Sequence, residues 1–263
     1  MARFCPLFSS SSGNSWYIGS GTGGILVDAG VSAKRLDTAL NEAGLDISGI
    51  HGIFITHEHT DHVSGLRVFA SRHQIPVYTS RGTLEALTEN GIVNGKYPAS
   101  VINEQGIEVA GMKIHPFPTS HDCREGYGYV IHTADDHKVA VCTDLGEVTD
   151  AVLSAITGCE LVVMESNHDV RMLENGPYPY PLKRRILSSR GHLSNDACGK
   201  VLTNLLRTGT RRFFLGHLST KNNNPYLAKQ TSLTALTEAG AVEGSDYLLQ
   251  VVPKVSNGAL TIF

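Results

Sequence analysis

Short apolar runs alternate with polar turns along the first third of the chain. Each run is rich in β-branched or aromatic residues and is bounded by Gly, Ser, Asn or Thr, which predicts a strand. We predict strands at residues 4–8, 15–18, 24–28, 53–55 and 77–79. Between them, apolar residues recur every three or four positions, which predicts helices. The helices are expected at residues 32–43, 63–70 and 83–90.

The rest of the chain continues this mixture of strands and helices. Alternating residues over 107–141 predict antiparallel strands, interrupted by a Pro-bounded loop at 116–122. Buried strands are predicted at 139–142, 161–164, 212–215 and 247–252, and helices at 195–206 and 226–239. Residues 174–181 hold three Pro and two Tyr, which favours an extended loop. No linker-like segment divides the chain, so we predict one α/β domain over residues 1–263.

Composition narrows the class of protein. A chain of 263 residues can bury a large core. Its net charge of −3 does not indicate a nucleic-acid-binding protein, although a protein of this charge can still have a basic patch on its surface. Five widely spaced Cys without a C-x-x-C motif suit a reducing compartment. Neither an export signal nor a membrane span is recognisable, so we expect a cytoplasmic protein without a membrane partner.

The chemistry is concentrated in the turn His57-Glu58-His59-Thr60-Asp61-His62, between a predicted strand and helix. Three imidazoles and a carboxylate match the ligands that zinc, iron or manganese prefers. Without a cation between them, charged or partly charged side chains this close together would repel one another. The turn is not the zincin motif H-E-x-x-H, because position 61 is Asp.

Further polar residues follow predicted strands elsewhere in the chain. Asp144 and Glu165 come at strand ends, and His121 lies in the Pro-bounded loop. Carboxyl ends of strands are where ligands commonly lie in α/β proteins. Two Gly-His-Leu-Ser segments place His192 before a helix and His217 directly after a strand. We expect His217 to bind metal and His192 to be catalytic, and the reverse order stays open.

The sequence pattern H-x-H-x-D-H of this turn resembles the signature motif of the metallo-β-lactamase superfamily. Longer strings resemble its YycJ/WalJ-like exonuclease branch. They are the opening loop of residues 9–14, Asp28-Ala29-Gly30, Glu165-Ser166-Asn167-His168-Asp169 and the paired Gly-His-Leu-Ser segments. From the residues alone, the opening loop is either a flexible connection, which we favour, or backbone that faces the substrate. The resemblance implies a four-layer αβ/βα sandwich that holds two divalent metal ions, zinc or manganese, with iron as a further candidate.

The resemblance also implies a role for each candidate residue. The implied metal ligands are His57, His59, Asp61, His62, His121, Asp144 and His217. One metal takes His57, His59 and His121. The second takes Asp61, His62 and His217, and Asp144 bridges the two. Asp61 also orients the attacking water, while His192, polarised by Glu165, protonates the leaving oxygen.

The implied function is a metal-dependent hydrolase, a cytoplasmic 5′-to-3′ DNA exonuclease linked to DNA repair. We expect Lys183, Arg184 and Arg185 to hold the nucleic-acid strand, the alternative being a solvated helix start. Alternatives for the whole chain are a ribonuclease, a cyclic phosphodiesterase or a glyoxalase II-like thioesterase. A non-catalytic, metal-bound regulatory scaffold is the alternative from another class. The sequence carries no signal for the oligomeric state.

Overall fold

The computed structural model describes residues 1–21 and 23–263, which form two compact units. The first unit comprises Met1–Phe117, Cys123–His137 and Pro253–Phe263. The second comprises Pro118–Asp122 and Lys138–Val252. Thr22, in the loop between the second and third predicted strands, lies outside the described residues. The prediction of a single domain stays a prediction.

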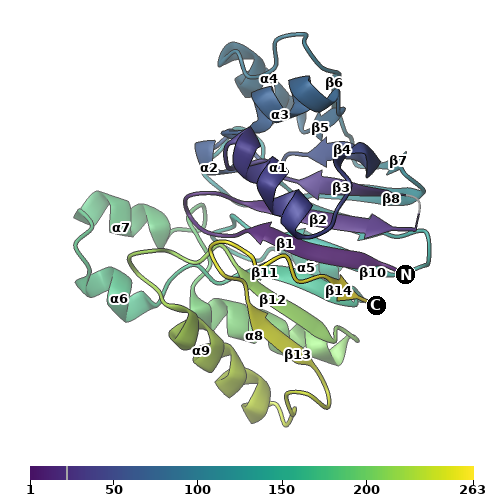
Figure 1. Ribbon diagram of the computed structural model, residues 1–263. Helices are drawn as coiled ribbons and strands as arrows, with labels where there is room; N and C mark the ends of the chain where they lie inside the picture. Colours follow the sequence, from purple (N-terminus) through teal and green to yellow (C-terminus); the bar gives the residue numbers. More distant parts are fainter. Residues whose placement is uncertain (22) are drawn as a thin grey trace. The chain divides into compact units, whose positions relative to one another are not determined.

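A mixed sheet forms the centre of the first unit, with strand order β14-β1-β2-β3-β4-β5-β6 (Figure 1). Its strands are β1 (Arg3–Phe8), β2 (Ser15–Ser20), β3 (Gly23–Val27), β4 (Ile50–Phe54), β5 (Val77–Thr79), β6 (Ala99–Val101) and β14 (Thr261–Ile262). From β3 to β6 the strands are parallel, whereas β14, β1, β2 and β3 pair antiparallel. The unit also contains β7 (Ile107–Val109), β8 (Met112–Pro118) and β9 (Tyr127–His132), which are not strands of this sheet.

Amphipathic helices cover this first sheet. They are α1 (Ala33–Glu42), α2 (Thr60–Val63), α3 (Leu66–His73) and α4 (Arg81–Glu89), with a 3₁₀ turn at Ile47–Gly49. The helix α1 contacts both β1 and α3. Leu36 and Leu40 of α1 and Phe69 of α3 are buried in one core with Leu26 and Ile53 of the sheet. This core fixes the strand β4, and with it the turn that carries the His residues.

Four strands of the second unit pair parallel to one another, in the order β13-β12-β11-β10. They are β10 (Lys138–Cys142), β11 (Leu161–Glu165), β12 (Arg212–Gly216) and β13 (Leu248–Val251). The helices are α5 (Asp150–Ile156), α6 (Val170–Asn175), α7 (Tyr180–Ile186), α8 (Asn195–Arg207) and α9 (Pro225–Glu238). In register, Cys142 lies beside Met164, and Met164 beside Leu215. The residues after these strand ends therefore share one edge of the sheet.

Three local predictions were wrong in detail. The helix predicted over 63–70 is two helices, because the backbone N–H of Gly65 leaves the helix to bind the carbonyl of Ala29 at 2.9 Å. The strand β8 continues through Pro116 and Pro118 into the predicted loop. Of the extended loop predicted at 174–181, only residues 176–179 lie outside helices, because α6 ends at Asn175 and α7 begins at Tyr180.

Among the described residues, no helix combines the length and the apolar character needed to cross a membrane.

Candidate metal centre

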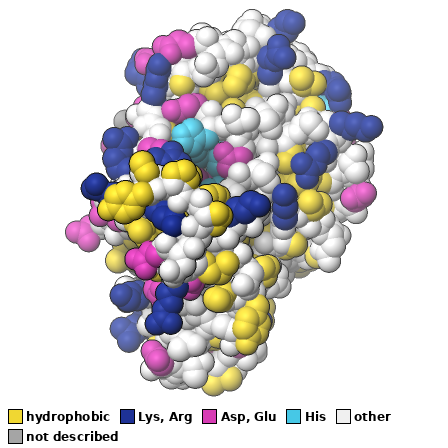
Figure 2. Space-filling model, turned by 90° about the vertical axis from the view of Figure 1, so that its left-hand side faces the viewer, with side chains coloured by type: hydrophobic (Ala, Val, Ile, Leu, Met, Phe, Trp, Pro, Cys, Tyr) yellow, Lys and Arg dark blue, Asp and Glu magenta, His cyan; other side chains and the backbone are white. Residues whose placement is uncertain are grey.

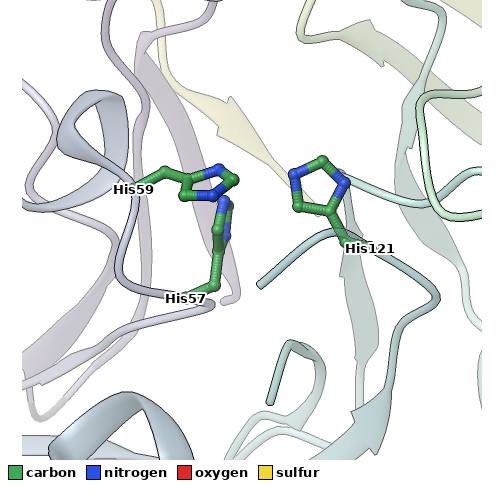
Figure 3. Close-up of side chains that lie close together, drawn as sticks. All are labelled: His57, His59 and His121. Carbon is green, nitrogen blue, oxygen red and sulfur yellow. The ribbon is translucent and has the colours of Figure 1, made fainter. Parts of the chain in front are cut away.

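In the first unit, the His-rich turn follows β4 directly. The rings of His57 and His59 lie edge to face with centroids 4.5 Å apart (Figure 3). The ring of His62 lies 4.2 Å from that of His57. Asp61 and His62 belong to the first turn of α2, where the helix dipole favours the carboxylate. One turn and one short helix thus gather all four predicted ligands of this unit.

Asp28 braces this group from the end of β3. Its Oδ2 atom lies 2.7 Å from Nδ1 of His62, and its Oδ1 atom accepts the backbone N–H of Thr56 at 2.9 Å. Burial raises the pKa of Asp28, and the neighbouring His62 ring opposes that rise. A proton held on Nδ1 of His62 leaves Nε2 as the ring's electron-pair donor. Asp28 is therefore placed to position the His62 ring.

Asn14 is a contact of the turn that the sequence did not identify. Its backbone N–H donates to the carbonyl of Asp61 at 2.9 Å, and its side-chain Nδ2 lies 3.2 Å from Nε2 of His62. Its own carbonyl accepts the N–H of Gly30 at 2.8 Å. A Cβ atom at Gly30 would lie 1.7 Å from the Asp61 carbonyl, so only Gly permits this approach. The opening loop is thus packed against the turn and is more than a connection.

In the second unit, Glu165 organises two imidazoles. Its Oε1 atom accepts hydrogen bonds from Nδ1 of His192 at 2.9 Å and from Nδ1 of His217 at 2.8 Å. Its Oε2 atom accepts the backbone N–H groups of Leu145 and Leu193 at 3.1 and 3.0 Å. Each oxygen thus accepts two hydrogen bonds, so Glu165 is placed to orient both imidazoles.

The carboxylate of Glu165 and the ring of His192 each favour the charged form of the other. Burial disfavours the ionised form of Glu165, but hydrogen bonds and charge from His192 and His217 outweigh it and hold the pKa of Glu165 below its ordinary value. Burial likewise disfavours the charged ring of His192, yet Glu165 and Asp144 raise the pKa of His192. His192 is therefore biased towards the protonated form that a general acid needs.

Asp144 lies at the centre of the second unit's polar cluster. Its Oδ1 atom is 3.4 Å from Nδ1 of His217, 3.7 Å from Nδ1 of His192 and 3.8 Å from Nε2 of His121. Asp144 and His217 have φ angles of 59° and 55°, and Asp28 in the first unit has 63°. Left-handed backbone at a non-glycine residue is uncommon and costs on the order of 1 kcal/mol or more. In each case the chain turns sharply just beyond a strand.

His121, whose ring is drawn in Figure 3, lies in the segment between β8 and β9 and belongs to this cluster. Its Nδ1 atom lies 2.9 Å from the carbonyl of Gly191, and its ring centroid is 4.9 Å from that of His192. Arg190 donates to the His121 carbonyl at 3.1 Å and fixes the loop. Burial lowers the pKa of His121, which favours the neutral imidazole that binds metals.

The donor atoms of both units fit divalent metal ions. Among the predicted His ligands, those of residues 57, 62, 121 and 217 have Nδ1 beside an oxygen, which leaves Nε2 facing away from that oxygen. Such outer oxygens typically accompany metal-binding His residues. Asp144, Glu165, His192 and His217 also lie close enough for their ligand atoms to share an ion. The assignment of individual ligands stays a prediction.

The three predicted basic residues lie in the last turn of α7, where positive charge interacts favourably with the negative end of the helix dipole. Arg185 forms an ion pair with Asp122, and Lys183 Nζ donates to the carbonyl of Glu174 at 2.7 Å. Their role in holding nucleic acid stays a prediction. Of the three, Arg184 is exposed and makes no such contact within the described residues.

Another buried polar network, which the sequence did not predict, lies behind Glu165. Ser194 is the N-cap of α8, and Asn195 is its first residue. The side chain of Asn195 exchanges hydrogen bonds with Asn223 at 3.0 and 2.9 Å and accepts from Ser166 at 2.7 Å. His168 in the same segment is 1% exposed. Isolated Asn residues give no sequence signal of such pairing.

Comparison with known proteins agrees with this architecture. Residues 24–218 match the model of the beta-lactamase superfamily domain. The chain is 37% identical over 241 residues to exodeoxyribonuclease YycJ of Bacillus anthracis, covering 90% of each chain. It is 35% identical over 249 residues to exodeoxyribonuclease WalJ of Streptococcus pneumoniae serotype 2, covering 93% of this chain and 92% of that protein.

A solved structure shows the same fold. The metallo-β-lactamase fold protein YhfI of Bacillus subtilis superposes with a TM-score of 0.74 at 14% identity, and the match covers 100% of both chains. The α/β class and the metallo-β-lactamase type of fold predicted from the sequence are therefore confirmed. The chain belongs to the beta-lactamase superfamily and, within it, to the branch of metallo-β-lactamase-fold hydrolases that includes YycJ and WalJ.

Proposed function

We propose that this hydrolase cleaves phosphodiesters with two metal ions and acts as a 5′-to-3′ DNA exonuclease in DNA repair. The observation that carries the proposal is the sharing of one Glu165 oxygen by His192 and His217. This carboxylate orients a candidate proton donor and a candidate metal ligand together. The exodeoxyribonuclease names of two relatives at 35–37% identity support DNA as the substrate.

The proposal assigns His57, His59 and His121 to one metal ion. It assigns Asp61, His62 and His217 to the other, and Asp144 to both. Imidazole and carboxylate donors suit zinc, manganese and iron. When bound, two such ions lower the pKa of a water and neutralise charge on the phosphoryl oxygens.

The chain's own residues supply the proton chemistry. His192 holds a proton on Nδ1 against Glu165 and donates the proton of Nε2 to the leaving oxygen. General-acid catalysis of this kind contributes about 10²- to 10⁴-fold to the rate. Asp61, at the start of α2, orients the attacking water by accepting its hydrogen bond. Asn14 and Asp28 keep the side chains of the His-rich turn in place.

End-labelled DNA and RNA, incubated with zinc, manganese or iron in turn, test the proposal. We expect 5′-labelled single nucleotides from DNA as the first products, and a loss of at least about 10²-fold in Asp144→Ala. Asp150→Ala, at an exposed position on α5, is the matched control and should retain activity. Equal turnover of RNA would favour the ribonuclease alternative. Efficient thioester hydrolysis without DNA cleavage would contradict the proposal.

The proposal includes a nucleic-acid partner and a cytoplasmic location. Cysteine usage supports the location, since Cys5, Cys142, Cys159 and Cys198 are buried, unpaired thiols. Burial raises the pKa of Cys159 and of Cys198 to about 12, so neither is a reactive thiolate. These residues act as small core side chains.

A further inference from the structure

Helix α7 is joined directly to the segment that carries His192. The backbone N–H of His192 donates to the carbonyl of Ile186, the last residue of α7, at 3.0 Å. A Cβ atom at Gly191 would lie 2.1 Å from that same carbonyl oxygen, so the two segments are in close contact. Arg185 ties the helix to Asp122, the neighbour of His121. The end of α7 is thus held in a defined place beside the candidate general acid.

The outer face of α7 presents an aromatic ring and a guanidinium group. Tyr180 is 71% exposed, and Arg184 follows it by four residues, so both lie on one face of the helix. Lys183 and Arg185 are already engaged within the unit. Figure 2 shows hydrophobic side chains next to Lys and Arg side chains on the face that carries α6 and α7. Pro179 before the helix and Pro181 within its first turn restrict the backbone around Tyr180.

We propose that Tyr180 and Arg184 form a subsite for one nucleotide of a single-stranded nucleic acid. The base stacks on the Tyr180 ring, and the Arg184 guanidinium binds the adjoining phosphate. Aromatic stacking with a neighbouring cation is the general way in which proteins hold single strands without reading their sequence. The inference rests on the proposed function and adds to it the strandedness of the substrate, because a stacked base must be unpaired.

The length of α7 places the subsite relative to the reaction. Six helical steps of about 1.5 Å put Tyr180 about 9 Å from Ile186, whose carbonyl contacts His192. At about 3.4 Å per stacked nucleotide, this distance corresponds to about three nucleotides. Tyr180 would therefore hold a nucleotide that is not the one being cleaved. Its loss should weaken binding of an oligonucleotide without affecting a substrate too short to reach it.

The test compares Tyr180→Ala, Arg184→Ala and wild type on two substrates. One is a single-stranded oligodeoxynucleotide, and the other is bis(p-nitrophenyl) phosphate, which ends at the reacting phosphodiester. For the oligonucleotide we expect KM to rise about tenfold in each variant, with kcat nearly unchanged. The rate on the small diester should not change. Tyr180→Phe, which keeps the ring, should restore the wild-type KM.

Tyr226→Ala is the matched control, because Tyr226 is 73% exposed on α9 of the same unit. It should behave as wild type on both substrates. If Tyr180→Ala matched Tyr226→Ala, or if it lost activity equally on both substrates, the subsite would be refuted while the proposed function stood. If wild type cleaved neither substrate with any metal, the proposed function would be refuted, and with it the subsite that rests on it.

Discussion

His192 and His217 donate to the same oxygen of Glu165, at 2.9 and 2.8 Å. The two rings come from the loop before α8 and from the end of β12, and their centroids lie 5.4 Å apart. One buried carboxylate therefore sets the tautomer of both rings. The candidate acid and the candidate ligand cannot be repositioned independently, which makes Glu165 the most informative residue to change.

Replacing Glu165 by Gln should impair metal binding and turnover together. The amide keeps the size of the side chain but places an NH₂ group against backbone N–H groups or against the rings. We expect a 10- to 100-fold loss of metal affinity and of kcat/KM. Metal titration and steady-state kinetics measure the two effects. Glu174→Gln, at an exposed position of α6, is the control. Normal metal affinity in Glu165→Gln would show that His217 does not depend on it.

Single Ala substitutions should separate the roles of His192 and His217. His192→Ala should lower kcat by about 10²- to 10⁴-fold and keep its metal content, because only proton transfer is lost. His217→Ala should lose metal as well as turnover. Elemental analysis of the purified proteins decides between them. The opposite pattern of metal loss would show that the two His residues have exchanged roles.

Asn14→Ala should weaken the group formed by Asp61 and His62. The variant removes the amide whose Nδ2 atom donates to Oδ2 of Asp61 at 3.5 Å, and it keeps the backbone hydrogen bonds of the loop. We expect at least one metal ion to be lost more readily to a chelator, by about tenfold. Ser12→Ala, an exposed change in the same loop, should match wild type. Equal metal retention in the two variants would contradict a positioning role for Asn14.

The stability of the metal-free protein should fall in mild acid because of His168. Both ring nitrogens of His168 are buried and lack a hydrogen-bond partner among the described residues. Burial lowers the pKa of His168 from 6.5 to about 4. Between these values the unfolded chain binds more protons than the folded one, so the free energy of unfolding decreases as the pH falls. The contribution is on the order of 3 kcal/mol.

Urea unfolding at several pH values measures this effect. The slope between about pH 6.5 and 4 should flatten in His168→Gln, whatever its absolute stability. His51→Gln, at an exposed His, should keep the wild-type slope. An unchanged slope in His168→Gln would assign the acid sensitivity to other groups.

Neutralising Lys183, Arg184 and Arg185 together should weaken DNA binding and reduce its salt dependence. Because Lys183 and Arg185 already have partners in their own unit, Arg184→Ala alone should account for most of the change. Fluorescence anisotropy of labelled single-stranded DNA at increasing salt gives the slopes. A triple variant with the wild-type slope would count against any phosphate contact at α7.

The local pattern of the chain was enough to predict most elements around the site. The buried strand β11 ends at Glu165, and β12 ends just before His217, as their short apolar runs indicate. The exceptions depend on distant contacts. The helix break at Gly65 requires the carbonyl of Ala29, and α7, which includes Pro181 of the predicted loop, is tied to Asp122 by Arg185. Propensity is a weak guide wherever tertiary contacts decide the backbone.

The sequence by itself determined the His-rich turn, the candidate donors at the strand ends and the family, because residue type and local periodicity are written along the chain. Only the tertiary structure decided which donors share a partner. Glu165 meets His192 and His217 across 27 and 52 positions, and Asn14 meets His62 across 48. Such contacts form only when separate strands pack into one sheet or loops close against it, and no local pattern specifies them.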